Sequence, residues 1–161
     1  MATTENNLFN IDKGILQKDA FIIIVRTEWN AAVVDKLEEG CIKILQQYNM
    51  ENIKIINVPG AFEIPFCIRS FWDNTKLEKP RAFIALGCVI RGDTPHFDYI
   101  CKAVTDGILQ LNLSLPVPTI FGVLTVDDKQ QADERTGGEH GHKGEEAAIT
   151  ALKMIALQHS F

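Results

Sequence analysis

Four apolar runs divide the chain, and each has the length of a single strand. They are FIIIVR (21–26), IKIINV (53–58), AFIALGCVI (82–90) and PTIFGVLTV (118–126). Continuous, β-branched runs of this kind are typical of strands buried on both faces, as in a parallel sheet. The pattern therefore predicts four buried strands.

Between and after these runs, apolar residues recur at the three- and four-residue spacing of amphipathic helices. The spacing predicts a helix after Asn30 to about Tyr48, one over 61–72, one from Pro95 to about Leu111, a short one from Asp127 to about Arg135, and one over 144–158. The residue types at the helix starts make Asn30, Thr94 and Asp127 the expected N-caps, with Pro95 at a first helical position.

The alternation of strands and helices predicts an α/β fold. Strands that alternate with helices of this length form a four-stranded parallel sheet covered on both faces, with right-handed crossovers. A chain of 161 residues without repeats or a long linker fits one domain. About the first 12 residues are expected to form an N-terminal arm that is flexible in part.

Composition narrows the function classes. The net charge of −5 argues against a non-specific nucleic-acid binder, which needs a basic face. No apolar stretch is long enough to span a membrane, and the start of the chain lacks the pattern of a secretory signal. Four cysteines without a C-x-x-C pair are expected to be reduced thiols. These features predict a cytoplasmic protein.

The candidate chemistry gathers where the four strands end. In open α/β sheets, ligands bind outside the carboxyl ends of the strands. The segments after the four strands carry, in order, Trp29 and Asn30; Gly60, Ala61, Phe62 and Glu63; Arg91 to His96; and Asp127 and Asp128, with Arg135 and Lys143 further on. The sequence therefore predicts a site along this edge.

The segment RGDTPH (91–96) has two interpretations. Thr94 either caps the following helix and does nothing more, or it joins Gly92 and the free N–H groups of the helix start in an anion-binding turn. His96 is then either a polar residue without a function or a general base. The second is possible because the helix dipole disfavours the protonated form of the imidazole.

Glu63, Trp29 and Arg135 also have a plain and a functional interpretation. Glu63 either stabilises a helix start or accepts hydrogen bonds from a substrate. Trp29 either belongs to the core or stacks on a flat ring. Arg135 forms either a weak surface ion pair or a bidentate contact with phosphate.

The tract GGEHGHKG (137–144) is interpreted as a loop that presents Lys143. It also holds His140 and His142, an H-x-H pair of the kind that binds metals. No third ligand has a persuasive spacing, so a metal site is not expected.

Three blocks of this chain closely resemble the 6,7-dimethyl-8-ribityllumazine synthase family. They are VPGAFEIP, ALGCVIRGDTPHFDY and FGVLTVDDKQQADERTGG with the following GHKG, and the likeness covers about residues 20–157. The resemblance implies a flavodoxin-like three-layer α/β/α sandwich. It also implies a reaction that joins 5-amino-6-ribitylaminouracil to 3,4-dihydroxy-2-butanone 4-phosphate, without metal or organic cofactor.

The resemblance further implies roles for individual residues. They are His96 in proton transfer; Trp29, Asn30, Ala61, Glu63, Val89, Ile90, Phe121 and Lys143 at the uracil ring and ribityl chain; and Gly92, Asp93, Thr94 and Arg135 at the phosphate. Phe121 and Lys143 match residues that a neighbouring subunit supplies. Asp93 departs from the small residue common in the family, so its carboxylate is expected to turn away from phosphate.

The family also implies a homo-oligomer with sites between neighbouring subunits. Its subunits form pentamers, and in some members twelve pentamers make a 60-subunit shell, for which riboflavin synthase is a candidate partner. Two other functions stay open at this point. One is a non-catalytic flavin or lumazine binder, which would not need Arg135 together with His96; the other is a shell that mainly encloses another protein.

Overall fold

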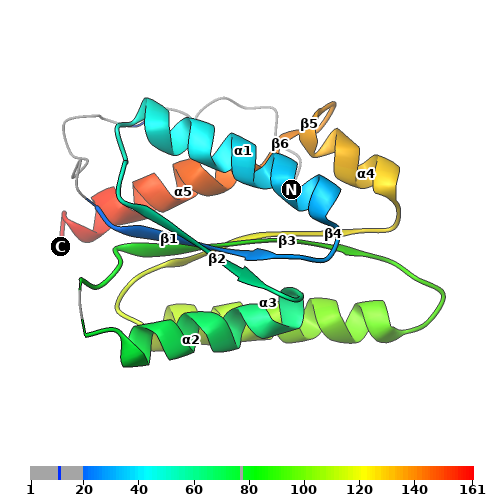
Figure 1. Cartoon of the computed structure of the whole chain (residues 1–161), viewed down its shortest axis with the longest axis horizontal. Helices are drawn as coiled ribbons and strands as arrows, with labels where there is room; N and C mark the ends of the chain where they lie inside the picture. Colours follow the sequence, from blue (N-terminus) through cyan, green and yellow to red (C-terminus); the bar gives the residue numbers. More distant parts are fainter. Residues whose placement is uncertain (1–10, 12–19, 77) are drawn as a thin grey trace.

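A computed structural model describes residue 11, residues 20–76 and residues 78–161 of the chain. Three layers are visible in it: α1, α4 and α5 lie on one face of a central sheet, and α2 and α3 lie on the other (Figure 1). The expected N-terminal arm falls outside the described residues, apart from Ile11. The predicted α/β/α sandwich is confirmed.

The central sheet has four parallel strands in the order β2-β1-β3-β4. The strands are β1 (Ile22–Thr27), β2 (Ile53–Val58), β3 (Ala82–Ile90) and β4 (Thr119–Val126). All four predicted strands are present. β1 and β3 are the two central strands, and their carboxyl ends lie side by side. β2 and β4 are the outer strands.

The helices and turns connect these strands. They are α1 (Ala31–Gln47), the 3₁₀ turn η2 (Ala61–Glu63), α2 (Ile64–Asn74), α3 (His96–Ser114), α4 (Lys129–Glu134) and α5 (Lys143–Gln158). A small antiparallel hairpin, β5 (Thr136–Gly138) and β6 (Gly141–His142), lies between α4 and α5. No helix in the described ranges is both long enough and apolar enough to cross a membrane.

The core consists of one apolar layer on each face of the sheet, and β1 shows why. Ile22, Ile23, Ile24 and Val25 are all fully buried. Side chains alternate between the faces of a strand. Ile22 and Ile24 therefore pack with α1 and α5, whereas Ile23 and Val25 pack with α2 and α3.

Two glycines allow the helices to approach closely. A Cβ atom on Gly144 of α5 would lie 2.0 Å from the carbonyl oxygen of Leu37 in α1. One on Gly107 of α3 would lie 2.5 Å from Cγ of Pro65 in α2. The two helices on each face of the sheet, α1 with α5 and α2 with α3, therefore pack closely against each other.

The structure confirms the position of one expected helix cap and corrects two others. Asn30 occupies the cap position of α1, but its side chain makes no capping hydrogen bond. Thr94 does not cap α3, which begins at His96 after Pro95. The cap of α4 is Asp128, whose carboxylate accepts from the N–H of Gln131, and not Asp127.

The glycine-rich tract forms the β5–β6 hairpin and is not simply a loop. Gly137 and Gly141 have φ angles of 111° and 76°, a region that favours glycine. The N–H of Lys143 donates to the carbonyl of Arg135 at 2.9 Å. The hairpin therefore fixes Lys143 at the start of α5, close in space to Arg135.

Candidate functional site

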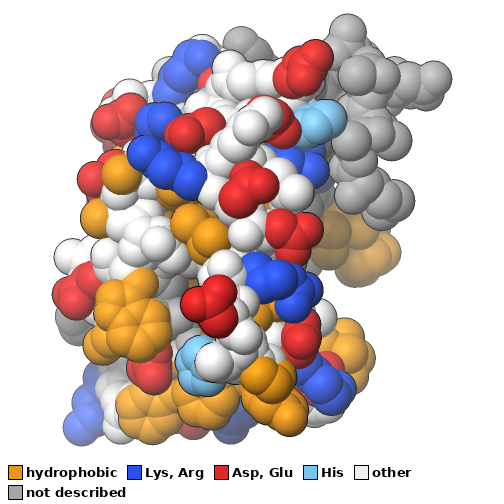
Figure 2. Space-filling view, turned by 90° about the vertical axis from the view of Figure 1, so that its right-hand side faces the viewer, with side chains coloured by type: hydrophobic (Ala, Val, Ile, Leu, Met, Phe, Trp, Pro, Cys, Tyr) orange, Lys and Arg blue, Asp and Glu red, His pale blue; other side chains and the backbone are white. Residues whose placement is uncertain are grey.

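A pocket of about 470 Å³ lies at the carboxyl ends of β1 and β3. It is lined by Thr27, Trp29, Asn30, Ala61, Phe62, Glu63, Cys88, Val89, Ile90, His96 and Ile100, and we call it the strand-end pocket. Figure 2 faces this edge of the molecule and shows hydrophobic side chains gathered in its lower half, on the side of α2 and α3. The pocket unites residues from three of the four predicted segments.

Trp29 offers an exposed aromatic surface at the pocket. Its side chain is 66% exposed, although its backbone N–H donates to the carbonyl of Pro59 at 3.2 Å. A Cβ atom on Gly60 would lie 2.9 Å from Cε3 of the indole. The missing side chain of Gly60 therefore lets the indole lie against the end of β2.

Asn30 joins the ends of the two central strands. It has a left-handed backbone, with φ of 59°, and its side-chain Nδ2 donates to the carbonyl of Cys88 at 2.8 Å. Cys88 is buried, and that burial raises the pKa of its thiol to about 11. The thiol is therefore neutral near pH 7 and forms an uncharged part of the pocket wall.

Glu63 presents an acceptor that the protein leaves open. Its carboxylate atom Oε2 is buried and has no hydrogen-bond partner within the described part of the chain. A buried acceptor without a partner costs about 1–3 kcal/mol, and a charged one costs more. A bound molecule that donates an O–H or N–H to Glu63 would remove that cost.

His96 and the turn before it lie beside the pocket. His96 is the first residue of α3 and lines the pocket with an exposed imidazole. Gly92, Asp93 and Thr94 are exposed and do not line the pocket, but they lead directly into this helix. The first N–H groups of a helix lack partners within it, so this end of α3 suits an anion.

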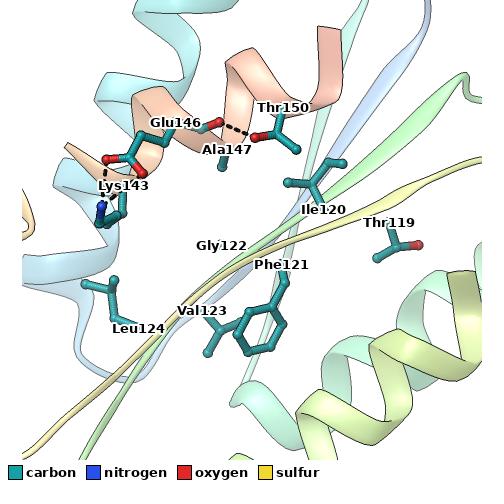
Figure 3. A pocket seen from close by; sticks show the side chains of 10 residues that line it. All are labelled: Thr119, Ile120, Phe121, Gly122, Val123, Leu124, Lys143, Glu146, Ala147 and Thr150. Carbon is teal, nitrogen blue, oxygen red and sulfur yellow. Dashed lines mark hydrogen bonds and ion pairs between the residues drawn. The ribbon is translucent and has the colours of Figure 1, made fainter. Parts of the chain in front are cut away.

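A second hollow, of about 580 Å³, follows the outer strand β4 and the start of α5. We call it the β4 rim, and its lining is Thr119, Ile120, Phe121, Gly122, Val123, Leu124, Lys143, Glu146, Ala147 and Thr150 (Figure 3). Lys143 Nζ lies 2.7 Å and 2.9 Å from the two carboxylate oxygens of Glu146. Phe121 is 43% exposed and points from β4 to the side away from α5.

Arg135 lies outside both hollows. It follows the last residue of α4, where its Nη1 donates to the carbonyl of Gln131 at 2.9 Å and lies 3.9 Å from Oε2 of Glu134. A single chain therefore brings the indole of Trp29 and the imidazole of His96 to one pocket. It does not bring Arg135, Phe121 or Lys143 there.

The histidine pair has structural contacts. No group of three or more His, Cys, Asp or Glu side chains in the described ranges could hold a metal ion. The His142 ring lies where a side chain on Gly40 would be, and its Nδ1 accepts from the N–H of Glu145 at 3.4 Å. His140 Nε2 lies 3.7 Å from Glu134 Oε2.

Several pocket residues were not among the sequence candidates. Thr27, Cys88 and Ile100 line the pocket. Cys88 was assigned only to a strand, Ile100 only to the buried side of a helix, and Thr27 to no element, because the first predicted strand ends at residue 26. Their position is decided by how the sheet edge and α3 meet. Phe62 is different, because it stands in the segment after the second strand, where a functional position could be expected.

Comparison with known proteins decides the family. The family model for 6,7-dimethyl-8-ribityllumazine synthase matches residues 19–159. The 6,7-dimethyl-8-ribityllumazine synthase of Parabacteroides distasonis is 45% identical over 159 residues, covering 96% of this chain and 98% of its own length. Those of Porphyromonas gingivalis and Cytophaga hutchinsonii are each 46% identical, covering 98% and 97% of this chain and 99% and 98% of their own.

The chain belongs to the 6,7-dimethyl-8-ribityllumazine synthase family. It is a transferase of riboflavin biosynthesis that joins 5-amino-6-ribitylaminouracil to 3,4-dihydroxy-2-butanone 4-phosphate and releases phosphate and water. Membership of the lumazine synthase family also implies small-molecule substrates and an oligomer. The resemblance identified from the three sequence blocks is confirmed.

Proposed function

We propose that this reaction takes place in a composite site, in which the strand-end pocket of one subunit faces the β4 rim and Arg135 of its neighbour. The observation that carries the proposal is the gathering of Trp29, Glu63 and His96 in one pocket that lacks a cation. Arg135, the cation assigned to the phosphate, and Lys143 both lie outside this pocket. A second copy of the chain supplies them without any rearrangement of the fold.

In this site, the strand-end pocket binds 5-amino-6-ribitylaminouracil. The exposed indole of Trp29 stacks on the uracil ring, with Asn30 beside it and Val89 and Ile90 at the ring edge. Ala61 and Glu63 contact the ribityl chain. The open carboxylate oxygen of Glu63 matches a ligand with many hydroxyl donors.

The start of α3 binds the phosphate of the second substrate. Gly92, Asp93 and Thr94 offer backbone N–H groups, and the carboxylate of Asp93 turns away from the anion. Arg135 of the neighbouring subunit contributes a guanidinium, which matches phosphate with two parallel donors. Phe121 and Lys143 come from the same neighbour and close the site.

His96 stands between the two substrates and transfers protons. The aromatic amine attacks the ketone, and loss of water gives an imine. A proton then leaves carbon as the C–O bond to phosphate breaks, and the resulting enol becomes a ketone. The second amine adds to that carbonyl and closes the ring with loss of a second water. A correctly positioned general base raises the rate by about 10²–10⁴-fold. The remaining acceleration comes from holding the two substrates together in the reactive orientation.

The composite site fits a heterologous interface, in which a pocket on one copy meets a different surface of the next. Such an interface generates a ring when its rotation closes. By the family resemblance we expect a pentamer, extended to a 60-subunit shell, with riboflavin synthase as a candidate partner. A cytoplasmic location is expected from the sequence.

Mixed assemblies test the shared site. His96→Ala damages the pocket side and Arg135→Ala damages the rim side, so each variant alone is impaired at every site. When the two variants are mixed, denatured and reassembled, random ring formation restores about one site in four. Lumazine fluorescence and free phosphate measure the recovery, and two separately assembled variants that are mixed without exchange serve as the control.

Two results would overturn the proposal. Recovery that stays at the level of the unexchanged mixture would show that each chain carries its own complete site. Binding of the uracil compound by the wild type without release of phosphate or lumazine would identify a binding protein on the same fold.

A further inference from the structure

Arg91 links three structural elements around the anion-binding turn, although it does not line the strand-end pocket. Its Nε donates to Asp127 Oδ1 at 2.8 Å, and its Nη1 donates to Asp98 Oδ1 at 3.2 Å. Its guanidinium carbon lies 4.1 Å from the centre of the Phe97 ring. One planar side chain thus contacts the first turn of α3 and the segment that follows β4.

These contacts enclose residues 92–95. The turn begins directly after Arg91, whose N–H donates to the carbonyl of Val126 at 2.9 Å, and ends where His96 opens α3. A Cβ atom on Gly92 would meet nothing within 4 Å, so close packing does not hold this part of the turn. The side chain of Arg91 fixes both of its ends instead.

The partners of Arg91 are arranged to keep it in place. The hydrogen bond from Arg91 holds the pKa of Asp127 below its usual value, so this carboxylate stays charged at neutral pH. Asp127 N–H in turn donates to Gln131 Oε1 at 3.0 Å, which ties it to α4. Arg91 with two carboxylate partners carries no surplus positive charge to offer a ligand.

We infer that Arg91 is a positioning residue, which holds the 92–95 turn and His96 in the geometry that receives the phosphorylated substrate. The inference rests on the proposed role of that turn. Arg91 acts through Asp127, Asp98 and Phe97 and does not itself touch the phosphate. Small displacements of a reacting group are costly, with about 1 Å worth about 10²-fold in rate.

The test compares Arg91→Met, Arg91→Lys and Asp127→Asn with Arg69→Met, the control. Arg69 is an exposed arginine of α2 that pairs with Asp73 of the same helix at 2.7 Å. We expect Arg91→Met to raise KM for the butanone phosphate and the dissociation constant of inorganic phosphate by about 10-fold or more, with KM for the uracil compound within about twofold. Arg91→Lys should restore little of the phosphate affinity, because one ammonium group cannot replace the planar guanidinium that contacts Asp127 and Asp98 together.

Asp127→Asn separates positioning from direct binding. If Arg91 acts through these partners, Asp127→Asn weakens phosphate binding in the same direction as Arg91→Met. Its effect is smaller, because the contacts with Asp98 and Phe97 remain, and the double variant with Arg91→Met loses no more than Arg91→Met alone. If Arg91 binds phosphate itself, Asp127→Asn frees it, phosphate affinity holds or improves, and the inference is wrong. Full rescue by Arg91→Lys, or an Arg91→Met variant equal to Arg69→Met, also overturns it.

The readouts keep this inference distinct from the proposed function. Inorganic phosphate binding by calorimetry at fixed ionic strength tests Arg91 whether or not lumazine forms. A wild type that binds phosphate but makes no lumazine contradicts the proposed function alone. Should Arg91→Met fail to assemble, the phosphate affinity of Asp127→Asn decides the question.

Discussion

The strand-end pocket and the β4 rim differ in whether their polar groups have hydrogen-bond partners. In the pocket, Glu63 keeps a buried carboxylate oxygen without a partner among the described residues, and the indole of Trp29 is mostly exposed. At the rim, Lys143 is paired with Glu146, and Arg135 near it donates to a backbone carbonyl. The pocket is open to a ligand, whereas the cations beside the rim already have partners.

This difference shows that the isolated fold bears a cost at the pocket, where Glu63 has a buried oxygen without a partner, and avoids such a cost beside the rim. An unpaired cation on a free surface has no stabilising contact, so internal partners hold Lys143 and Arg135 until a ligand arrives. In the proposed shared site, Arg135 would exchange its backbone partner for phosphate, and the open acceptor of Glu63 would gain a donor.

The largest expected effect is that of His96→Ala, which removes the imidazole proposed to transfer protons and leaves the other residues of the pocket unchanged. Turnover should fall by about 10²–10⁴-fold, the range for one general base, and remain measurable. Steady-state kinetics with lumazine fluorescence gives the rate, and His96→Gln, which keeps a polar side chain, should be slowed as well. Complete loss of activity in an intact assembly would contradict the division between proton transfer and positioning.

Arg135→Ala removes the guanidinium beside the rim and should mainly weaken phosphate binding. Loss of charge-assisted hydrogen bonds predicts a rise of about 10–100-fold in KM for the butanone phosphate. Titration with inorganic phosphate measures the same loss directly. Lys129→Ala, at the start of the short helix α4 that ends just before Arg135, is the matched control. If only the uracil compound binds more weakly, the phosphate role of Arg135 is wrong.

Gly60→Ala tests whether the indole must lie against the end of β2. A methyl group there would collide with the Trp29 ring and displace it. Affinity for the uracil compound should fall by about tenfold, equivalent to ~1.4 kcal/mol, while phosphate affinity is unchanged. Quenching of tryptophan fluorescence and phosphate calorimetry supply the two measurements. An equal loss in both would show a general disturbance of the fold.

The smallest effect concerns the link between the central strands. Asn30→Ala loses the hydrogen bond to Cys88 and places alanine in a left-handed conformation that asparagine tolerates better, for a cost of about 2 kcal/mol in the free energy of unfolding. Asn30→Gly keeps the backbone conformation and should cost about 1 kcal/mol. Denaturant unfolding at one protein concentration compares them. Equal stability of the two variants would show that backbone conformation adds nothing at this position.

The sequence alone determined the layers of the protein and the edge that carries the site. Strands β1 to β4 follow from continuous apolar runs, because a strand buried on both faces has no polar side to display. The alternation with amphipathic helices then leaves one architecture. Since parallel strands share a direction, Trp29, Glu63 and His96 had to reach the same edge.

Only the tertiary structure decided which of these residues share a cavity and what their polar atoms contact. Asn30 looks like an ordinary cap, but its side chain reaches Cys88, 58 residues away. Thr94 fits a cap pattern, yet α3 begins two residues later. Local patterns describe the neighbours of a residue along the chain, whereas these contacts depend on how strands and helices far apart in sequence pack together.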